Sequence, residues 1–215
     1  MSARTRSKPF FGLCLAVLAL GCLLAMAEDE KPTKAKIGEK APNFTLKDTK
    51  EQERSLSDFK GKTVILEWTN PECPYVRKHY GPTKSMEKTS RKVKELDSTA
   101  VWLAIDSTYG TTEKKLNFWI EQHDIKYPIL LDADGTVGHL YDARRTPHMF
   151  VIDKKGVLRY HGAIDDNPLL TKPEEETTNY VVNAVKQIVK GDVVSPDYVK
   201  PYGCTVKYKR PGPGG

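Results

Sequence analysis

The chain has 215 residues, a formal net charge of +6 at pH 7, and 29% charged residues. This length suggests one compact domain with appended segments, able to bury its own core, which excludes a small scaffold held together by a dense set of disulfides. The positive charge is weak and dispersed, so it does not favour a nucleic-acid partner.

The chain begins with the three parts of a secretory signal peptide. A positive head at residues 4–8 precedes an apolar stretch over 10–25, and Ala25-Met26-Ala27 is a small-x-small cleavage site. The apolar stretch is too short to favour a membrane span. We therefore assign residues 1–27 to a signal peptide and expect export to the periplasm or the extracellular space. Lipid anchoring at Cys22 is the disfavoured alternative, because the Ala-Met-Ala site is the better cleavage signal.

The remaining sequence alternates between strand and helix patterns. Residues 28–40 are charged and rich in Lys and Pro, which predicts a flexible lead-in. Strands are expected at 41–46, 64–68, 101–105, 149–152 and 157–161, with a short apolar segment at 127–131. Helices are expected from Pro74 to about Leu96 with a break at Gly81-Pro82, from Thr111 or Thr112, over 137–141, and from about Thr177 to Gly191. This order predicts an α/β domain over 41–191, with a central mixed sheet flanked by helices on both faces.

The last 24 residues, 192–215, are rich in Pro and Gly. Their hydrophobic pattern gives no sign of a regular element, so we expect an irregular C-terminal extension lying on the surface. This tail carries Cys204, one of the two cysteines that remain after the signal peptide is removed.

Cys73 is the first candidate for chemistry. It follows the strand at 64–68 and precedes Pro74, which suits the first position of a helix. Free backbone N–H groups at a helix start stabilise an anion, lower the pKa of a thiol and make it a better nucleophile. The alternative is a buried cysteine that only packs, which the polar, proline-bracketed surroundings disfavour.

The chain resembles the thioredoxin superfamily, and within it the redoxin group that includes the peroxiredoxins. The resemblance spans residues 37 to about 190. Three blocks carry it: the entry segments Ala41-Pro42-Asn43-Phe44-Thr45-Leu46 and Leu56-Ser57-Asp58-Phe59-Lys60-Gly61-Lys62, the active-site block from Glu67 to Lys78, and the segment from Thr146 to Asp153. The resemblance implies a thioredoxin-like fold and a cis-proline at Pro147 facing Cys73. It also implies that the Thr146 backbone is free to pair with an incoming partner.

The sequence departs from the motifs of three related groups, and these departures limit the reactions that the site could catalyse. Val76 stands where a thioredoxin has its second cysteine, so the local dithiol is missing. Asn70 and Leu66 stand at two positions of the peroxide-binding pattern of peroxiredoxins, which disfavours peroxide as the substrate. Arg77 occupies the place of the second cysteine of copper-delivery relatives, which weakens soft-metal binding.

Cys204 is the remaining partner for Cys73. A tail can carry such a residue back across the fold, as resolving cysteines do in several redoxins. We expect a cycle in which the Cys73 thiolate attacks an oxidised substrate, Cys204 resolves the product, and an external thiol reduces the disulfide. The alternative is a permanent staple, which would stabilise the fold by roughly 4–5 kcal/mol for a loop of this length.

Glu67 is a carboxyl residue in an otherwise apolar strand. A buried carboxyl has a raised pKa and can move protons to or from a leaving sulfur. The alternative is an ion pair with Arg77 or Lys78. Of the histidines, His79 is expected at the surface more than at the thiol, and His148 is a candidate for the cleft. Their spacing predicts no metal site, and no cofactor is predicted.

These features predict an exported redoxin-type thiol oxidoreductase that acts on oxidised protein or small-molecule thiols, or on peroxides, in cell redox homeostasis. Its candidate site residues are Cys73, Cys204, Thr146, Pro147 and Glu67. The alternative function is a non-enzymatic binding or metal-delivery module on the same scaffold, distinguished by a Cys73 pKa near that of free cysteine, about 8.5.

Overall fold

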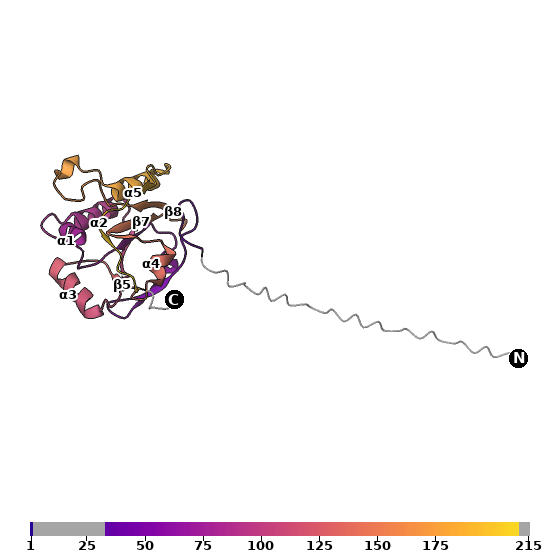
Figure 1. Cartoon of the computed structure of the whole chain (residues 1–215). Coiled ribbons are helices and arrows are strands. Elements are labelled where there is room, and N and C mark those ends of the chain that lie inside the picture. Colours follow the sequence, from indigo (N-terminus) through magenta and orange to yellow (C-terminus); the bar gives the residue numbers. More distant parts are fainter. Residues whose placement is uncertain (2–32, 211–215) are drawn as a thin grey trace. The chain divides into compact units, whose positions relative to one another are not determined.

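The computed structural model of the chain describes Met1 and residues 33–210. Cys22 and the rest of the predicted signal peptide beyond Met1 lie outside the described residues. Within 33–210 the chain forms a central mixed sheet with helices packed against it (Figure 1). The predicted α/β fold class is therefore confirmed.

Eight strands form the main sheet in the order β2-β1-β5-β4-β3-β7-β8-β9. They are β1 (Thr45–Asp48), β2 (Glu53–Ser55), β3 (Val64–Trp68), β4 (Val101–Asp106), β5 (Ile129–Leu131), β7 (His148–Ile152), β8 (Leu158–Gly162) and β9 (Tyr198–Val199). A second, two-stranded sheet pairs β6 (Arg145–Thr146) with β10 (Cys204–Thr205). Strand β3 lies at the centre, parallel to β4 and antiparallel to β7.

The helices follow the expected pattern closely. They are α1 (Pro74–Tyr80), α2 (Ser85–Leu96), α3 (Glu113–His123), α4 (Thr136–Leu140) and α5 (Tyr180–Lys190), with short 3-10 helices η1 (Leu56–Phe59) and η2 (Glu174–Glu176). The predicted break at Gly81-Pro82 separates α1 from α2. Thr112 caps α3 by accepting a hydrogen bond from the Lys115 N–H, and Gly191 ends α5 in the left-handed conformation, as expected.

The two faces of the sheet bury different sets of side chains because successive residues of a strand point to opposite sides. On one face, the core contains apolar residues of α1, α2, α3 and α5. On the other face, α4 and irregular segments supply the cover. Figure 1 shows α2 and α5 side by side on the first face. In β3, Ile65 faces the first core, while Leu66 and Trp68 face the second.

Both segments expected to lie loosely outside the domain pack against it. In the lead-in, the Ala35 N–H donates to the carbonyl of Leu140, and the Gly38 N–H donates to the carbonyl of Leu158. The backbones of Lys40 and Val157 pair in an isolated antiparallel β-bridge. A charged composition predicts flexibility, but Ala35 and Ile37 give this segment enough apolar surface to dock.

The tail also differs from the irregular surface extension that was expected. Its first part forms β9, which runs parallel to β8 at the edge of the main sheet. Its second part forms β10 and then buries Val206, which is 5% exposed. The inward side chains Tyr202, Cys204, Val206 and Tyr208 alternate with residues directed outward, so the tail has the period of a strand after all.

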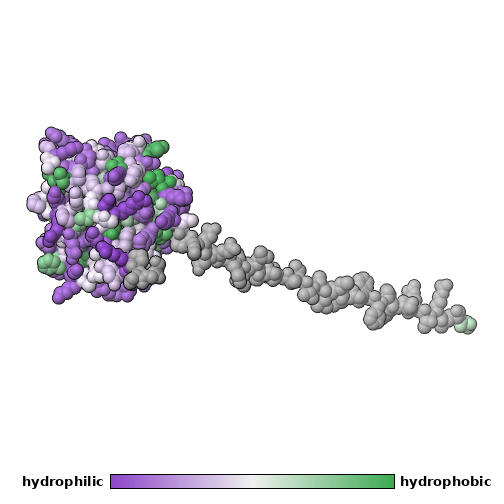
Figure 2. Space-filling model, viewed as in Figure 1, coloured by the Kyte–Doolittle hydropathy of each residue, from purple (hydrophilic) through white to green (hydrophobic). Residues whose placement is uncertain are grey.

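The surface gives little sign of a large apolar contact area. Figure 2 shows a mostly hydrophilic face with small, separate hydrophobic patches. The large apolar side chains exposed within residues 33–210 are Tyr109, Phe118, Leu169, Val189, Val193 and Tyr198. No helix in the described part of the chain is long and apolar enough to cross a membrane.

The packing of β9 generates a first prediction. Gly162 has a φ of +144°, and a Cβ at this position would lie 1.9 Å from the carbonyl oxygen of Val199. Gly162→Ala is therefore expected to push β9 off the sheet edge. We expect it to lower the free energy of unfolding by about 2 kcal/mol more than Gly61→Ala does. Gly61 is the control because it also has a positive φ, but a Cβ added there would meet no atom within 4 Å. Urea unfolding measures both, and equal losses would contradict the prediction.

Candidate functional site

Cys73 lies where the sequence predicted it. It is the N-cap residue of α1, and Pro74 occupies the first helical position. The turn that precedes it is held by Asn70, whose side-chain oxygen accepts the Glu72 N–H at 2.7 Å and whose carbonyl accepts the Cys73 N–H. Cys73 is only 2% exposed and belongs to the core cluster, so it is more buried than an open loop would leave it.

The tail covers Cys73. Strand β10 pairs antiparallel with β6, and Cys204 lies opposite Thr146. The Cys73 thiol donates a hydrogen bond to the carbonyl oxygen of Thr146 at 3.0 Å. The Cys204 thiol is close enough to hydrogen-bond with the Cys73 sulfur, and both cysteines are free thiols. The structure thus brings together the two cysteines that the sequence analysis paired across the length of the domain.

A glycine permits this close approach. Gly203 has a φ of +106°, and a Cβ there would lie 2.1 Å from the carbonyl oxygen of Thr146. Any other residue at this position would clash with the backbone of β6 as well as being strained. The contact between Gly203 and Thr146 therefore determines how near Cys204 comes to Cys73.

The two thiols have different acidities. Burial alone would raise the pKa of Cys73, but hydrogen bonds from the side chains of Cys204 and Thr146 and from the backbone of Val76 and Cys204 favour the thiolate and lower it. Burial and the neighbouring Cys73 raise the pKa of Cys204 to about 11. Of the pair, Cys73 is the sulfur that ionises first.

The Thr146–Pro147 peptide bond is cis, as the resemblance implied. The Thr146 backbone, however, is not free for an incoming partner, because β10 already pairs with it and Cys73 bonds to its carbonyl. That part of the expectation is wrong, and the reason is the packed tail. The Thr146 hydroxyl is buried and, apart from its contact with the Cys73 sulfur, has no hydrogen-bond partner among the described residues.

Glu67 is fully buried in β3 and has no basic partner. Its carboxylate accepts hydrogen bonds from the Tyr80 hydroxyl at 2.8 and 2.9 Å, from the Trp102 indole at 3.0 Å and from the Tyr127 hydroxyl at 3.3 Å. Burial raises the pKa of Glu67 even though these donors oppose the shift. The alternative of an ion pair with Arg77 or Lys78 is wrong.

Both basic residues point away from Glu67, because they lie on the exposed side of α1. Glu67 and Cys73 face the same side of the sheet, but neither Cys73 nor Cys204 hydrogen-bonds to Glu67. Its role in proton transfer stays a prediction.

A chain of hydrogen bonds anchors the tail two residues before Cys204. The Tyr202 hydroxyl donates to Asp165 at 2.5 Å and bonds to Nε2 of His79 at 2.9 Å, and Nδ1 of His79 bonds to the Ser85 hydroxyl at 2.6 Å. This direction requires a proton on Nε2 of His79. Burial lowers the pKa of His79, which favours the neutral ring, in which Nδ1 accepts from the Ser85 hydroxyl. The Tyr202 ring stacks on His79 and packs against Tyr75. His79 is fully buried, so the expectation of a surface role is wrong.

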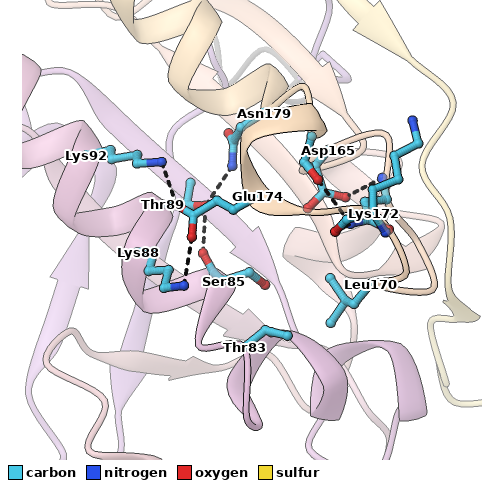
Figure 3. A pocket seen from close by; sticks show the side chains of 12 residues that line it. Thr83, Ser85, Lys88, Thr89, Lys92, Asp165, Leu170, Lys172, Glu174 and Asn179 are labelled. Atoms are coloured by element: carbon cyan, nitrogen blue, oxygen red, sulfur yellow. Dashed lines mark hydrogen bonds and ion pairs between the residues drawn. The ribbon is translucent and has the colours of Figure 1, made fainter.

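Ser85 and Asp165, the residues at the two ends of this series of hydrogen bonds, line a pocket of about 260 Å³ (Figure 3). Across it, Lys88 and Lys92 point toward Glu174, and each lies 2.8 Å from a Glu174 oxygen. The pocket therefore contains its own ion pairs, and it lies next to the anchor of the tail, not beside the thiols.

His148 does not bond to either thiol. It is 2% exposed, accepts the Arg144 N–H at 3.3 Å and bonds to His161 at 3.3 Å. Burial lowers its pKa well below the ordinary value. Within residues 33–210, no group of three or more His, Cys, Asp or Glu side chains is placed to hold a metal ion.

Sequence reasoning missed Tyr202, Asp165 and the aromatic donors around Glu67. The strand-like alternation at 202, 204, 206 and 208 was the available signal for Tyr202. No local pattern marks Asp165 or the donors, because separate elements bring them to their partners.

Comparison with known proteins identifies the family of the chain. The model of the AhpC/TSA family matches residues 37–161, which is more than half of the chain. The chain belongs to the AhpC/TSA family. Among curated relatives of this family member, the thiol-disulfide oxidoreductase ResA of Bacillus cereus is 31% identical over 145 residues, covering 64% of this chain and 76% of the relative. The thioredoxin-like protein YneN of Bacillus subtilis is 30% identical over 122 residues, covering 57% and 68%.

Solved structures share the fold of this AhpC/TSA member. An uncharacterised conserved protein of Geobacillus kaustophilus matches with a TM-score of 0.70 at 20% identity, covering 84% of this chain and 96% of that one. A putative protein disulfide isomerase of Bacteroides thetaiotaomicron matches with a TM-score of 0.58 at 20% identity, covering 74% and 93%. These matches support the thioredoxin-like architecture of the sheet and its helices.

The anchor at Tyr202 generates a second prediction. Tyr202→Phe removes the hydroxyl that joins His79 to Asp165 and leaves both buried groups short of a partner. We expect the free energy of unfolding to fall by about 1–3 kcal/mol, and limited proteolysis after residue 195 to become faster. Tyr198→Phe is the matched control, because Tyr198 is 49% exposed and its change should stay within about 0.5 kcal/mol. Equal effects of the two variants would show that the anchor does not stabilise the tail.

Glu67 generates a third prediction. Because folding raises its pKa above the ordinary 4.5, its contribution to stability is complete below that pH and is lost as the pH rises through the folded value. The unfolding free energy of Glu67→Gln should therefore fall less with pH above about 4.5 than that of the wild type. The difference amounts to about 1.4 kcal/mol for each unit by which the pKa is raised. Denaturant unfolding at a series of pH values measures it, and parallel profiles would contradict it.

Proposed function

We propose that this protein is an exported thiol oxidoreductase in which Cys73 is the nucleophile and Cys204 the resolving cysteine. The single observation that carries the proposal is the placement of Cys204 opposite Thr146, whose carbonyl accepts the Cys73 thiol. In this arrangement the second thiol comes from the tail, because Val76 stands on the helix where a thioredoxin has its second cysteine. The similarity to proteins named thiol-disulfide oxidoreductases supports the reaction class, and the predicted signal peptide supports export.

The proposed cycle follows from the acidities of the thiols. The Cys73 thiolate attacks one sulfur of a disulfide substrate, forms a mixed disulfide with it and releases the other half as a thiolate. Cys204 then loses its proton and attacks Cys73. The substrate leaves as a thiol, and Cys73 and Cys204 are joined. An external thiol reductant returns both cysteines to the reduced state, so two electrons pass from the reductant to the substrate.

Disulfides are favoured over peroxides as the substrate. A peroxide would convert the Cys73 thiolate to a sulfenic acid, from which Cys204 would displace water. The position that carries a hydroxyl residue in peroxiredoxins is Asn70 here, and its side chain is used to hold the turn before Cys73. Glu67 is proposed to exchange protons during resolution, with its raised pKa as support.

The fourth prediction tests the cycle by mass spectrometry with peptide mapping, which distinguishes Cys73 and Cys204 from the leader cysteines. After one equivalent of a small disulfide such as hydroxyethyl disulfide, the wild type should contain a Cys73–Cys204 bond and the released thiol. Cys204→Ser should stop at a mixed disulfide on Cys73, and Cys73→Ser should react at least tenfold more slowly. A parallel series with hydrogen peroxide shows whether sulfenic acid forms on Cys73.

Two results would contradict the proposal. A Cys73 that reacts with neither reagent would favour the binding or metal-delivery module. A Cys73–Cys204 bond that resists mild dithiol, and whose loss sharply lowers the melting temperature, would favour the permanent staple.

A further inference from the structure

We propose that the basic surface around Cys204 is the docking site for an acidic segment of the partner protein with which the Cys73–Cys204 pair exchanges electrons. This inference rests on the proposed function and adds to it the chemistry of the partner. Three observations carry it: the positive charge gathered around Cys204, the lack of carboxylates to neutralise that charge, and the exposed aromatic rings beside it.

Positive charge is concentrated on the tail on both sides of Cys204 in the sequence. Residues 198–210 contain no Asp or Glu, and they include four basic residues, all exposed: Lys200, Lys207, Lys209 and Arg210. The pairing of β6 with β10 adds Arg145, which lies opposite Thr205, and its neighbour Arg144. The charge is therefore gathered beside the thiol pair more than the overall composition indicated.

Most of these cations have no carboxylate partner. Within residues 33–210, no salt bridge involves Arg145 or any of the four basic residues of the tail. Burial and the neighbouring Cys73 raise the pKa of Cys204 to about 11, and Lys207 and Arg145 oppose that rise, so both cations act at the sulfur. A carboxylate from outside can pair with these cations without breaking an existing ion pair.

A groove beside β10 offers a place for an acidic side chain. It has a volume of about 390 Å³, and its lining includes Arg144, Arg145, Lys200 and Tyr198. Asp142 is the one carboxylate among the described residues that line it, and Asp142 already lies 2.6 Å from Arg144. The groove is therefore positive, and a guanidinium matches the geometry of a carboxylate.

Two exposed tyrosines adjoin the cations. Tyr198 lines the groove and is 49% exposed. Tyr109 is 59% exposed, its N–H donates to the carbonyl of Lys207, and the Lys209 ammonium lies 5.7 Å from the centre of its ring. Tyrosine and arginine are enriched where proteins contact one another, because tyrosine gives a large contact area at a low cost in conformational entropy. The surface therefore fits a protein segment better than a free anion.

The position of the charge beside a reactive thiol gives it a function. Cys204 is partly exposed, and Thr205, the next residue, lines the groove. Acidic side chains close to a partner's cysteine would therefore bring that sulfur to the pair. Complementary charge raises the rate of association and fixes the orientation of the partner. The exchange itself balances simply: two partner thiols are oxidised to one disulfide, and the Cys73–Cys204 bond is reduced to two thiols.

Reduction by model peptides tests the inference on the full chain. The protein is oxidised with diamide until the Cys73–Cys204 bond is complete. It is then reduced by blocked pentapeptides in which a central cysteine is flanked by glutamate, glutamine or lysine, and loss of the bond is followed by mass spectrometry. Each rate is divided by the rate of the same peptide with hydroxyethyl disulfide, which is uncharged. This division removes the effect of the flanking charges on the acidity of the peptide thiol.

We expect the normalised rate of the glutamate peptide to exceed that of the lysine peptide by about tenfold or more at an ionic strength of about 0.01 M. The difference should nearly vanish at about 1 M, because the Debye length falls from ~30 Å to ~3 Å. Lys200→Glu should lower the ratio of the glutamate rate to the glutamine rate about threefold or more, and Lys207→Glu should do the same.

Lys186→Glu is the matched control, since it changes the net charge by the same amount. Lys186 is exposed on α5, which packs on the face of the sheet opposite α4 and the groove. It should leave the ratio of the glutamate rate to the glutamine rate unchanged. Equal effects of Lys186→Glu and Lys200→Glu would overturn the inference, because they would reflect the net charge of the molecule and not this surface.

Equal normalised rates for the three peptides at low salt would also overturn the inference and leave the proposed function standing, since the bond would have formed and been reduced. If the rates are equal and the protein instead binds vesicles of phosphatidylglycerol, the cations serve a membrane surface and the inference is wrong. Failure of diamide to produce the Cys73–Cys204 bond would overturn both proposals.

Discussion

The pairing of β10 with β6 is the contact on which the rest of the site depends. It places the Cys204 thiol beside Cys73 and occupies the Thr146 backbone. It requires a glycine at 203, since a side chain there would collide with the Thr146 carbonyl. A single backbone contact thus determines which second thiol Cys73 meets and what else can reach it. The anchor at Tyr202 and the buried Val206 hold the strand on either side of this contact.

The site also contains two kinds of buried polar group. The Glu67 carboxylate is surrounded by hydroxyl and indole donors, so its burial raises its pKa without leaving it unpartnered. His79 and Asp165 are paired through Tyr202, a residue of the tail. All the hydrogen-bond donors to Glu67 that are named above come from the central fold. His79 and Asp165, by contrast, have their shared partner Tyr202 only when the tail is docked. Docking of the tail is therefore stabilised by polar groups that would otherwise be buried without partners.

The central fold could be predicted from the sequence because its signals are local. The apolar run at 64–68, the proline after Cys73 and the cap at Thr112 each specify an element through its neighbours in sequence. The position of Cys204 beside Cys73 was a hypothesis from cysteine count. The structure adds the pairing of Cys204 with Thr146, which brings the two thiols together as this hypothesis requires.

The occupied Thr146 backbone and the buried His79 could not be predicted, because both depend on where a distant, Pro- and Gly-rich segment packs. The alternation at 202, 204, 206 and 208 was the one local signal, and the composition around it obscured that pattern.

The distance along the chain between the two cysteines has a consequence for electron transfer. A bond between them closes a ring of about 130 residues that contains β4, β5, β7 and β8. Closing so large a ring disfavours the unfolded chain by roughly 4–5 kcal/mol on chain-entropy grounds. Because such linkage is reciprocal, the folded structure lowers the reduction potential of this disulfide by about 100 mV relative to the same pair in the unfolded chain. In the proposed cycle, the fold thus sets which reductants are strong enough to reduce this disulfide.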